Sequence, residues 1–281
     1  MDNKKICLVA IKKVINPYAK VKIITNNADD SSDNNYKCNK IDLQNVPFVI
    51  NPLDEIAIEA AVQLKTQGKI DHIIAVSIGS DCKDILTQAL ARGADRAILI
   101  QTAEFISPLN IAKILKYLIM ANNVNLAILG KQAVDYDFNQ TGQMLAGLLN
   151  WPQACFASKI SFNHNECNNN LNNFDLSIDR EIDTGLETLQ LKLPAIITVD
   201  LLLNEPQRLN LNQLLQAKKK SIDIIDLQDL INKQLISLDF NQLKILTNNY
   251  PTVSVKNCIK INNPLDLIQK LITEDKVLIR Y

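Results

Sequence analysis

The order of apolar segments between residues 5 and 149 constrains the fold more than any other feature of the sequence. Short continuous apolar runs, typical of buried strands, alternate with longer segments in which apolar residues recur every three or four positions, as in helices. The expected strands are 5–11, 72–78, 95–100 and 125–130, and the expected helices are 53–66, 82–92, 108–121 and 139–149. This alternation predicts an α/β fold with a doubly wound, mainly parallel sheet and helices on both faces.

The pattern changes after Gln153. Segments such as "ACFASKISF" and "LETLQLKLPAIITV" indicate further strands, which we expect to be antiparallel additions to the same sheet, with a polar loop at 163–173 between them. Beyond "AKKK" the chain lacks an alternation of strands and helices. We therefore expect an α/β domain over residues 1–220 and an extended C-terminal arm over 221–281, with one helix near 264–273. An arm of this kind usually needs a partner to lie against.

Composition excludes several classes of protein. With 281 residues, of which 47% are hydrophobic, the chain can bury a full-sized core. Its 30 basic and 30 acidic residues balance, which argues against a general attraction to nucleic acid or to an acidic membrane surface. No apolar run approaches the roughly 18 residues of a membrane-spanning helix, and the start of the chain does not resemble a signal peptide. The sequence predicts a soluble protein.

Cysteine and histidine give no sign of catalysis or metal binding. The six cysteines are scattered without a C-x-x-C pair, which fits inert thiols in a reducing compartment better than disulfides or a zinc site. Neither of the two histidines, His72 and His164, lies near an arguable serine or cysteine nucleophile, so a hydrolase triad has no support.

In a sheet of this kind a ligand lies outside the carboxyl ends of the strands. The residues there are Ala10–Lys13, Ser77–Ser80 and 130–142, all small or polar. They contain neither the G-x-G-x-x-G pattern of a dinucleotide fold nor the glycine-rich phosphate loop of a nucleotide hydrolase. A nucleotide site would therefore have to be built from helix N-termini and other loops.

Two segments resemble helix starts of the required kind. In "GKQAVDYDFNQTGQM" (130–144), Asp137 with Gln140 three positions later predicts an N-cap and its capping-box partner, which leaves free N–H groups near Asn139 and Thr141 for an anion. In "NPLDEIAIEAAVQL" (51–64), a proline opens a helix with two acidic residues in its first turn. Taken alone, each is adequately explained as an ordinary capped helix.

Together with their neighbours, however, these segments resemble a known family. "NPLDEIAIEAAVQLK", "AVSIGSD", "LARGADRAI", "LGKQAVDYDFNQTGQMLAGLLNWPQACFAS", "REIDTGLETLQLKLPAIITVDLLLNEPQRL" and "QAKKK" follow one another as they do in the beta subunit of electron transfer flavoprotein. The resemblance implies a Rossmann-like, adenine-nucleotide-binding fold in a heterodimer with the alpha subunit, on which the arm packs. It implies FAD held mostly by the alpha subunit, a structural AMP in the beta subunit, and electron transport without substrate chemistry of the chain's own.

The resemblance also assigns residues. Tyr18 and Leu53 would lie near the flavin, and Tyr136 replaces an acidic residue common in the family. The AMP pocket would be formed by Ala10, Asn51, Pro52, Leu53, Asp54, Ile78, Gly130, Lys131, Gln132, Asp135, Asp137, Asn139, Gln140 and Thr141.

The segment 204–220 resembles the family's recognition loop, which docks partner dehydrogenases. Leu211 stands in the position of its anchoring leucine, followed by the basic residues Lys218, Lys219 and Lys220. The implied partners are acyl-CoA and related dehydrogenases, which would reduce the flavin in fatty acid beta-oxidation, and a membrane-bound electron transfer flavoprotein–quinone oxidoreductase, which would reoxidise it. Without the resemblance, Leu211 is an ordinary exposed leucine.

Two alternatives remain open at this point. One is a bifurcating relative that carries a second FAD in place of AMP, against which the bulk of Tyr136 and the retained "DFNQTG" argue. The other is a stand-alone nucleotide-binding module resembling universal stress proteins, which would need a better phosphate loop than "LGKQAVDYDFNQTG". The expected location is the bacterial cytoplasm, or the mitochondrial matrix if the chain is eukaryotic.

Overall fold

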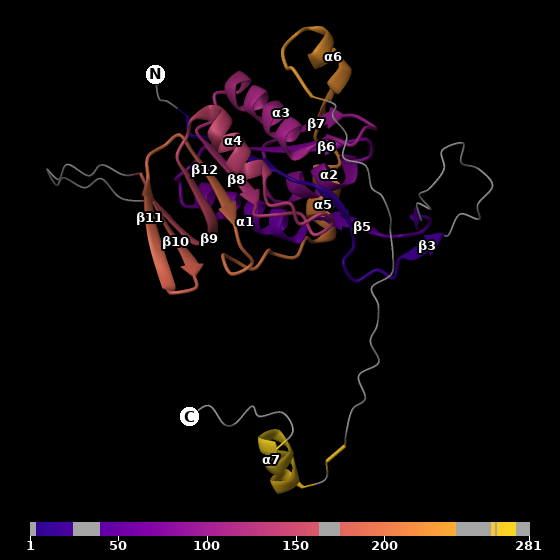
Figure 1. The fold of residues 1–281 in the computed structure, drawn as a ribbon. Coiled ribbons are helices and arrows are strands. Elements are labelled where there is room, and N and C mark those ends of the chain that lie inside the picture. Colours follow the sequence, from indigo (N-terminus) through magenta and orange to yellow (C-terminus); the bar gives the residue numbers. More distant parts are fainter. Residues whose placement is uncertain (1–3, 25–39, 163–174, 240–259, 262, 274–281) are drawn as a thin grey trace, which may run out of the picture. The chain divides into compact units, whose positions relative to one another are not determined.

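The computed structural model describes residues 4–24, 40–162, 175–239, 260–261 and 263–273 (Figure 1). Its main feature is a nine-stranded sheet with the order β11-β10-β9-β12-β8-β1-β6-β7-β13. These strands are β1 (Ile6–Ala10), β6 (His72–Gly79), β7 (Arg96–Gln101), β8 (Leu126–Gly130), β9 (Gln153–Phe162), β10 (Leu176–Ile182), β11 (Gly185–Leu191), β12 (Ala195–Val199) and β13 (Asp223–Asp226).

Helices cover both faces of this sheet (Figure 1). Helices α1 (Pro52–Thr66) and α2 (Lys83–Arg92) pack on one face, and α3 (Pro108–Ala121) and α4 (Thr141–Leu149) pack on the other. The central strands are parallel and buried on both faces, which explains their continuous apolar sequences. The predicted doubly wound α/β fold is confirmed, and the predicted helices and central strands end within about three residues of the observed ones.

Local signals set the helix boundaries. Pro52 and Pro108 occupy the first turns of α1 and α3, where a missing N–H costs nothing, and the Ser107 hydroxyl accepts a hydrogen bond from the Asn110 N–H. At the other end of α2, Gly93 adopts φ 130°, which its lack of a side chain permits.

The second half of the sheet only partly follows the expectation. Strands β9, β10 and β11 form antiparallel pairs as predicted, but β12 is parallel to both of its neighbours, β8 and β9. All five residues of β12 are buried, whereas β11 alternates exposed and half-buried residues at the sheet edge. The polar loop predicted at 163–173 lies outside the described residues.

One strand lies in the segment that the sequence analysis assigned to the arm. Strand β13 pairs in parallel with β7 and leads into α6 (Leu227–Asn232), so the sheet continues past Lys220. Its four residues are mostly exposed, so neither alternation nor an apolar run marks it. The boundary between an α/β domain and an arm at residue 220 stays a prediction. Helix α7 (Pro264–Thr273) coincides with the helix expected near 264–273.

The chain divides into two units, 1–22 with 42–244, and 23–41 with 245–281. In the first unit β2 (Lys13–Ile15) and β5 (Phe48–Ile50) form a small antiparallel ribbon. Strands β3 (Lys22–Ile24) and β4 (Lys40–Asp42) form another two-stranded sheet. In the second unit α7 is amphipathic, and none of its described side chains is buried.

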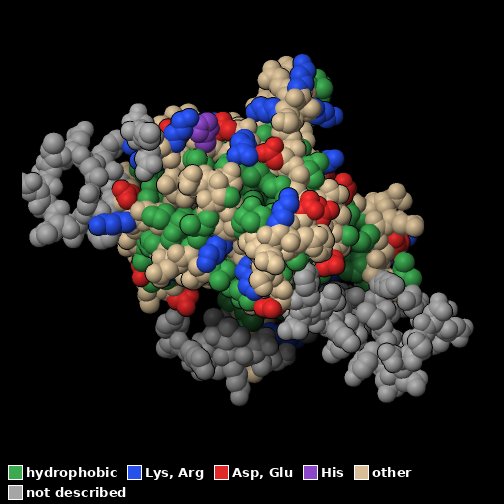
Figure 2. Space-filling model, turned by 90° about the horizontal axis from the view of Figure 1, so that it is seen from above, with side chains coloured by type: hydrophobic (Ala, Val, Ile, Leu, Met, Phe, Trp, Pro, Cys, Tyr) green, Lys and Arg blue, Asp and Glu red, His purple; other side chains and the backbone are tan. Residues whose placement is uncertain are grey.

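Charges of both signs are intermingled on the surface. Figure 2 shows lysine and arginine side chains interspersed with acidic and apolar ones on the face seen from above, without a field of one sign. This agrees with the balanced composition and gives no support to a nucleic-acid interface. Within the described ranges, no helix has the length and apolar character needed to span a bilayer.

Candidate functional site

A pocket opens where the strand order reverses. The chain runs from β1 to its neighbour β6 and on to β7, then returns to the other side of β1 as β8. Such a reversal is where open α/β sheets bind ligands, because the connections leave the sheet on opposite faces and a crevice forms between them. The pocket has a volume of about 150 Å³, roughly ten times the space one water needs. It can accept a small organic molecule.

Many of the residues assigned to the AMP pocket line this cavity, but some do not. The assigned residues in its lining are Ala10, Asp54, Ile78, Gly130, Lys131, Gln132, Asn139, Gln140 and Thr141. The other five are not part of the lining. Pro52 begins α1, Leu53 is buried, and Asn51, Asp135 and Asp137 bind other parts of the pocket wall as described below.

Asp54 joins the ends of the two strands that flank the pocket. Its carboxylate accepts hydrogen bonds from the Lys12 N–H, just after β1, at 2.8 Å, and from the Gly130 N–H, at the end of β8, at 3.2 Å. Burial raises the pKa of Asp54 to about 7, although both backbone donors favour the charged form. A side chain at Gly130 would overlap Asp54 and Leu53, so only glycine allows α1 and β8 to approach this closely.

Hydrogen bonds hold the loop after β8 in place. The Asn51 amide donates to the Gln132 carbonyl at 2.9 Å, and its oxygen accepts from the Val134 N–H at 3.2 Å. Gln132 in turn donates to the Asp137 carboxylate at 2.9 Å. Asn51 is fully buried, so it fixes the loop from beneath.

The predicted helix cap at Asp137 is wrong. Asp137 adopts a left-handed backbone conformation with φ 51° and turns back to Gln132, and α4 begins only at Thr141. Gln140 is the N-cap residue, and no side chain caps the helix. The N–H groups of the first turn of α4 therefore lack a side-chain acceptor, and Asn139, Gln140 and Thr141 bring that turn to the pocket wall.

The sequence analysis missed the aromatic part of the lining. Phe105, Tyr136 and Phe138 all border the pocket, as do the apolar residues Ile106 and Ile111. Phe105 follows β7, a strand whose carboxyl end was not among those considered. Applying the strand-end rule to all the parallel strands would have indicated the segment 102–107.

Lys12 was among the residues placed at the strand ends, Ala10–Lys13, but it was not assigned to the AMP pocket, whose lining includes it. Its ammonium lies 2.6 Å from the Asp135 carboxylate and 4.8 Å from the centre of the Tyr136 ring. Lys12 thereby links the end of β1 to the loop after β8. Its position immediately after a predicted strand was visible in the sequence, but its partners were not.

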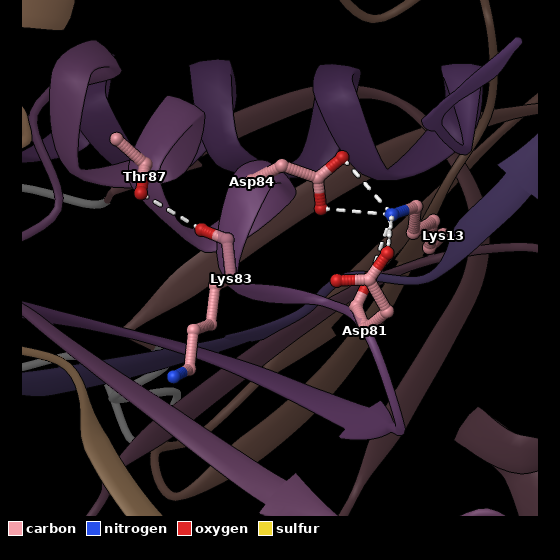
Figure 3. Close-up of polar contacts among 5 residues, drawn as sticks. All are labelled: Lys13, Asp81, Lys83, Asp84 and Thr87. Carbon is pink, nitrogen blue, oxygen red and sulfur yellow. Dashed lines mark hydrogen bonds and ion pairs between the residues drawn. The ribbon is translucent and has the colours of Figure 1, made fainter.

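A cluster of charges lies where β2 meets the start of α2. Figure 3 shows the Lys13 ammonium pointing toward Asp81 and Asp84; it lies 3.0 Å from an Asp81 oxygen and 3.1 Å from an Asp84 oxygen. Burial alone would lower the pKa of Lys13, but the hydrogen bonds to both carboxylates outweigh it and raise the pKa. The cluster ties the start of β2 to the start of α2. Tyr18, five residues after Lys13, has a side chain that is 95% exposed, and its N–H donates to the Asn16 side chain at 2.9 Å.

None of the predicted docking residues lines this pocket. Leu211 is 70% exposed and begins a short helix, α5 (Leu211–Ala217), which a capping box between Asn210 and Gln213 stabilises. Lys218, Lys219 and Lys220 follow the helix and are exposed. The segment before α5 is bound to α1 and α2: Arg92 donates to the Gln207 carbonyl at 2.7 Å, and Asn204 to the Ile56 carbonyl at 3.1 Å.

The described cysteines, Cys7, Cys82 and Cys155, are free. Burial raises the pKa of Cys7 and of Cys82, which keeps both thiols protonated and unreactive. Among the residues that the structure describes, no three histidine, cysteine or acidic side chains gather in a way that could hold a metal ion.

Comparison with known proteins places this chain in a family. Residues 39–230 match the electron transfer flavoprotein domain. The chain is 41% identical over 271 residues to the mitochondrial electron transfer flavoprotein subunit beta of Arabidopsis thaliana, an alignment that covers 96% of this chain and 98% of that protein. The chain belongs to the beta subunits of the electron transfer flavoprotein family.

Other beta subunits are similar over most of their length. The human protein is 42% identical over 228 residues, covering 79% of this chain and 82% of the human one. The beta subunit of Bradyrhizobium diazoefficiens is 39% identical over 273 residues, an alignment that covers 96% of this chain and 99% of that protein. The resemblance predicted from the sequence is confirmed, and with it the expectation of a flavoprotein subunit in electron transport.

Proposed function

We propose that this chain is half of a mobile electron carrier. Together with an alpha subunit, against which the arm 221–281 packs, it holds FAD and binds a structural AMP of its own. It receives electrons from acyl-CoA and related dehydrogenases and passes them to a membrane-bound quinone oxidoreductase. It carries out no substrate chemistry of its own. Membership of the electron transfer flavoprotein beta subunits supports the pairing and the flavin.

The observation that carries the AMP site is the pocket at the reversal of strand order. It combines an apolar wall suited to a base with the uncapped first turn of α4, suited to a phosphate. Gly142 lies so close to Thr198 that any side chain there would collide with it, which seats the start of α4 directly on β12. The position of the N–H groups is therefore set by the sheet.

The flavin and docking roles rest mainly on two exposed residues, Tyr18 and Leu211. Tyr18, almost fully exposed, would cover an edge of the flavin once the alpha subunit is present, with the buried Leu53 in the same vicinity. Leu211, with Lys218–Lys220 after it, would anchor the carrier on a dehydrogenase. The proposed location is the bacterial cytoplasm, or the mitochondrial matrix in a eukaryote; the Arabidopsis relative, which is named as mitochondrial, agrees with the second.

The test is the nucleotide content of the heterodimer. The chain is co-expressed with its alpha subunit, the purified complex is denatured, and the released nucleotides are separated and quantified. We expect one FAD and one AMP per heterodimer. Two FAD and no AMP would instead identify the bifurcating alternative, and a complex without any nucleotide would refute the proposal.

A charge reversal locates the phosphate. Gln140→Glu puts a carboxylate at the N-cap of α4, where it would repel a bound phosphate, so we expect less AMP and less heterodimer. Gln190→Glu adds the same charge on the exposed edge strand β11 and serves as the control. If Gln140→Glu assembles normally with a full complement of AMP, the phosphate is bound elsewhere.

A further inference from the structure

Three aromatic rings meet at the mouth of the pocket. Tyr136 stacks on Phe138, with ring centres 5.2 Å apart and an interplanar angle of 20°, and meets Phe105 edge to face at 5.6 Å. Each ring lines the pocket, and each side chain is also about 40% exposed to solvent. The rings therefore stand between the interior of the pocket and the solvent.

The three rings come from two loops that start far apart in the sheet. Phe105 belongs to the loop between β7 and α3, and Tyr136 and Phe138 belong to the loop between β8 and α4. Strands β1 and β6 lie between β7 and β8. The contact of Phe105 with Tyr136 thus crosses the carboxyl ends of two strands, and we name these three rings the aromatic bridge.

Contacts with Lys12 and within its own loop hold Tyr136 in place. Lys12, at the end of β1, contacts the Tyr136 ring with its ammonium and pairs with Asp135 beside it. The backbone of the same loop is fixed by the buried Asn51 and closed by a turn in which the Tyr136 N–H donates to the Ala133 carbonyl. These contacts hold Tyr136 in its stacked position.

We infer that the aromatic bridge is a gate over the pocket: it encloses a compact adenine mononucleotide, slows its release, and excludes a ligand that must continue out through the mouth. This inference rests on the proposed nucleotide site. A bound mononucleotide leaves only when Phe105 and Tyr136 separate, which breaks their ring contact and exposes apolar surface. A dinucleotide whose second half projects from the pocket would hold the rings apart.

The experiment measures nucleotide exchange. The intact heterodimer is loaded with its AMP and diluted into labelled AMP, and the rate at which label enters the protein is followed. We expect exchange in Tyr136→Ala to be about tenfold faster or more, because this variant loses both ring contacts and the contact with Lys12. Tenfold corresponds to about 1.4 kcal/mol in the barrier.

Tyr136→Phe is the matched variant. It keeps the ring and the cation contact and lacks only the hydroxyl, so we expect its exchange rate to stay within about twofold of the wild-type rate. If Tyr136→Ala fails to assemble, Phe105→Ala opens the bridge from its other side and replaces it in the same assay. Wild-type exchange rates in the alanine variant overturn the gate and leave the AMP site standing. A wild-type heterodimer without AMP overturns both.

Discussion

Asp54 has a buried carboxyl group, and its protonation is coupled to folding. Its side chain is 6% exposed, and burial raises its pKa from the ordinary 3.8 to about 7. The native state therefore binds more protons at this residue than the unfolded chain does between pH 4 and 7. By linkage, the free energy of unfolding falls as the pH rises through this window and levels off above it.

The pH dependence of stability tests this coupling. Asp54 alone should lower the free energy of unfolding by up to about 1.4 kcal/mol per pH unit between pH 4 and 7. In Asp54→Asn this component disappears, so the stability lost between pH 5 and pH 8, measured by urea unfolding of the heterodimer, should shrink. Asp183→Asn, in the exposed turn between β10 and β11, is the control. Equal pH slopes for all three proteins would show that Asp54 titrates normally.

Leu211 is the residue on which the docking proposal depends. An exposed leucine that fills an apolar pocket of a partner contributes roughly 1.5–3 kcal/mol, and one central anchor can dominate a small interface. Leu211→Ala should therefore slow flavin reduction by an acyl-CoA dehydrogenase about tenfold or more at subsaturating carrier. Reduction by dithionite should not change, since it needs no docking.

A leucine of matched exposure provides the control for Leu211. Leu186 on the edge strand β11 is 73% exposed, against 70% for Leu211, and lies in another part of the sheet. Leu186→Ala should leave both kinds of reduction unchanged. Equal slowing in the two variants would mean that Leu211 has no special role, and loss of dithionite reduction would mean damage to the flavin site.

Among the elements, α5 depends on the helices beneath it for its position. Arg92 at the end of α2, with 9% of its side chain exposed, donates to the Gln207 carbonyl and to the Glu55 carboxylate, each at 2.7 Å. Glu59 accepts from the Gln207 N–H at 3.3 Å. Gln207 is thus bound through both of its backbone groups, four residues before Leu211.

Removing this anchor should loosen the segment before α5. Arg92→Met leaves the Gln207 carbonyl and Glu55 without their donor, which should cost about 1–3 kcal/mol in stability. Arg208 lies exposed in the same segment, so we expect trypsin to cut there several times faster in the heterodimer of this variant. Arg96→Met removes an arginine whose ion pair with Asp223 is about half exposed, and it should leave the cleavage rate unchanged.

The elements were predictable where their signals are local. Pro52 and Pro108 begin α1 and α3, and Gly93 follows the last residue of α2. Each of these signals lies at the helix end itself, and these ends were predicted correctly. The features that were predicted wrongly or missed depend on residues that are distant in the sequence. Asp137 has the residue type of a cap, but Gln132 and the loop geometry hold it away from α4. Phe105 reaches the pocket only because β7 lies two strands from β1, and β13 is a strand only because β7 offers an unpaired edge.

At the scale of the whole molecule, the chain exposes apolar side chains that suit a partner better than water. Tyr18, Leu201, Leu202 and Leu211 are each more than half exposed, and α7 has an apolar face without buried residues in the described chain. Scattered exposed leucines are common, but adjacent ones such as Leu201 and Leu202 favour association.

The behaviour of the isolated chain tests this view. Expressed without an alpha subunit, it should bind no FAD stably and should aggregate, because the flavin-facing surface and the arm have nothing to cover them. Light scattering after gel filtration and the flavin absorbance of the sample are the measurements, with the co-expressed heterodimer as the reference. A yellow, monodisperse preparation of this chain alone would contradict the prediction.

The contact of Gly142 with Thr198 also fixes the order of events during synthesis. The first turn of α4 rests on β12, and β12 completes the pairing of β8. A ribosome must therefore deliver the chain as far as residue 199 before this end of the pocket has its final shape, although β1 emerged almost two hundred residues earlier. A nucleotide in this pocket would therefore bind only after β12 has joined the sheet, and would stabilise a late stage of folding rather than the first one.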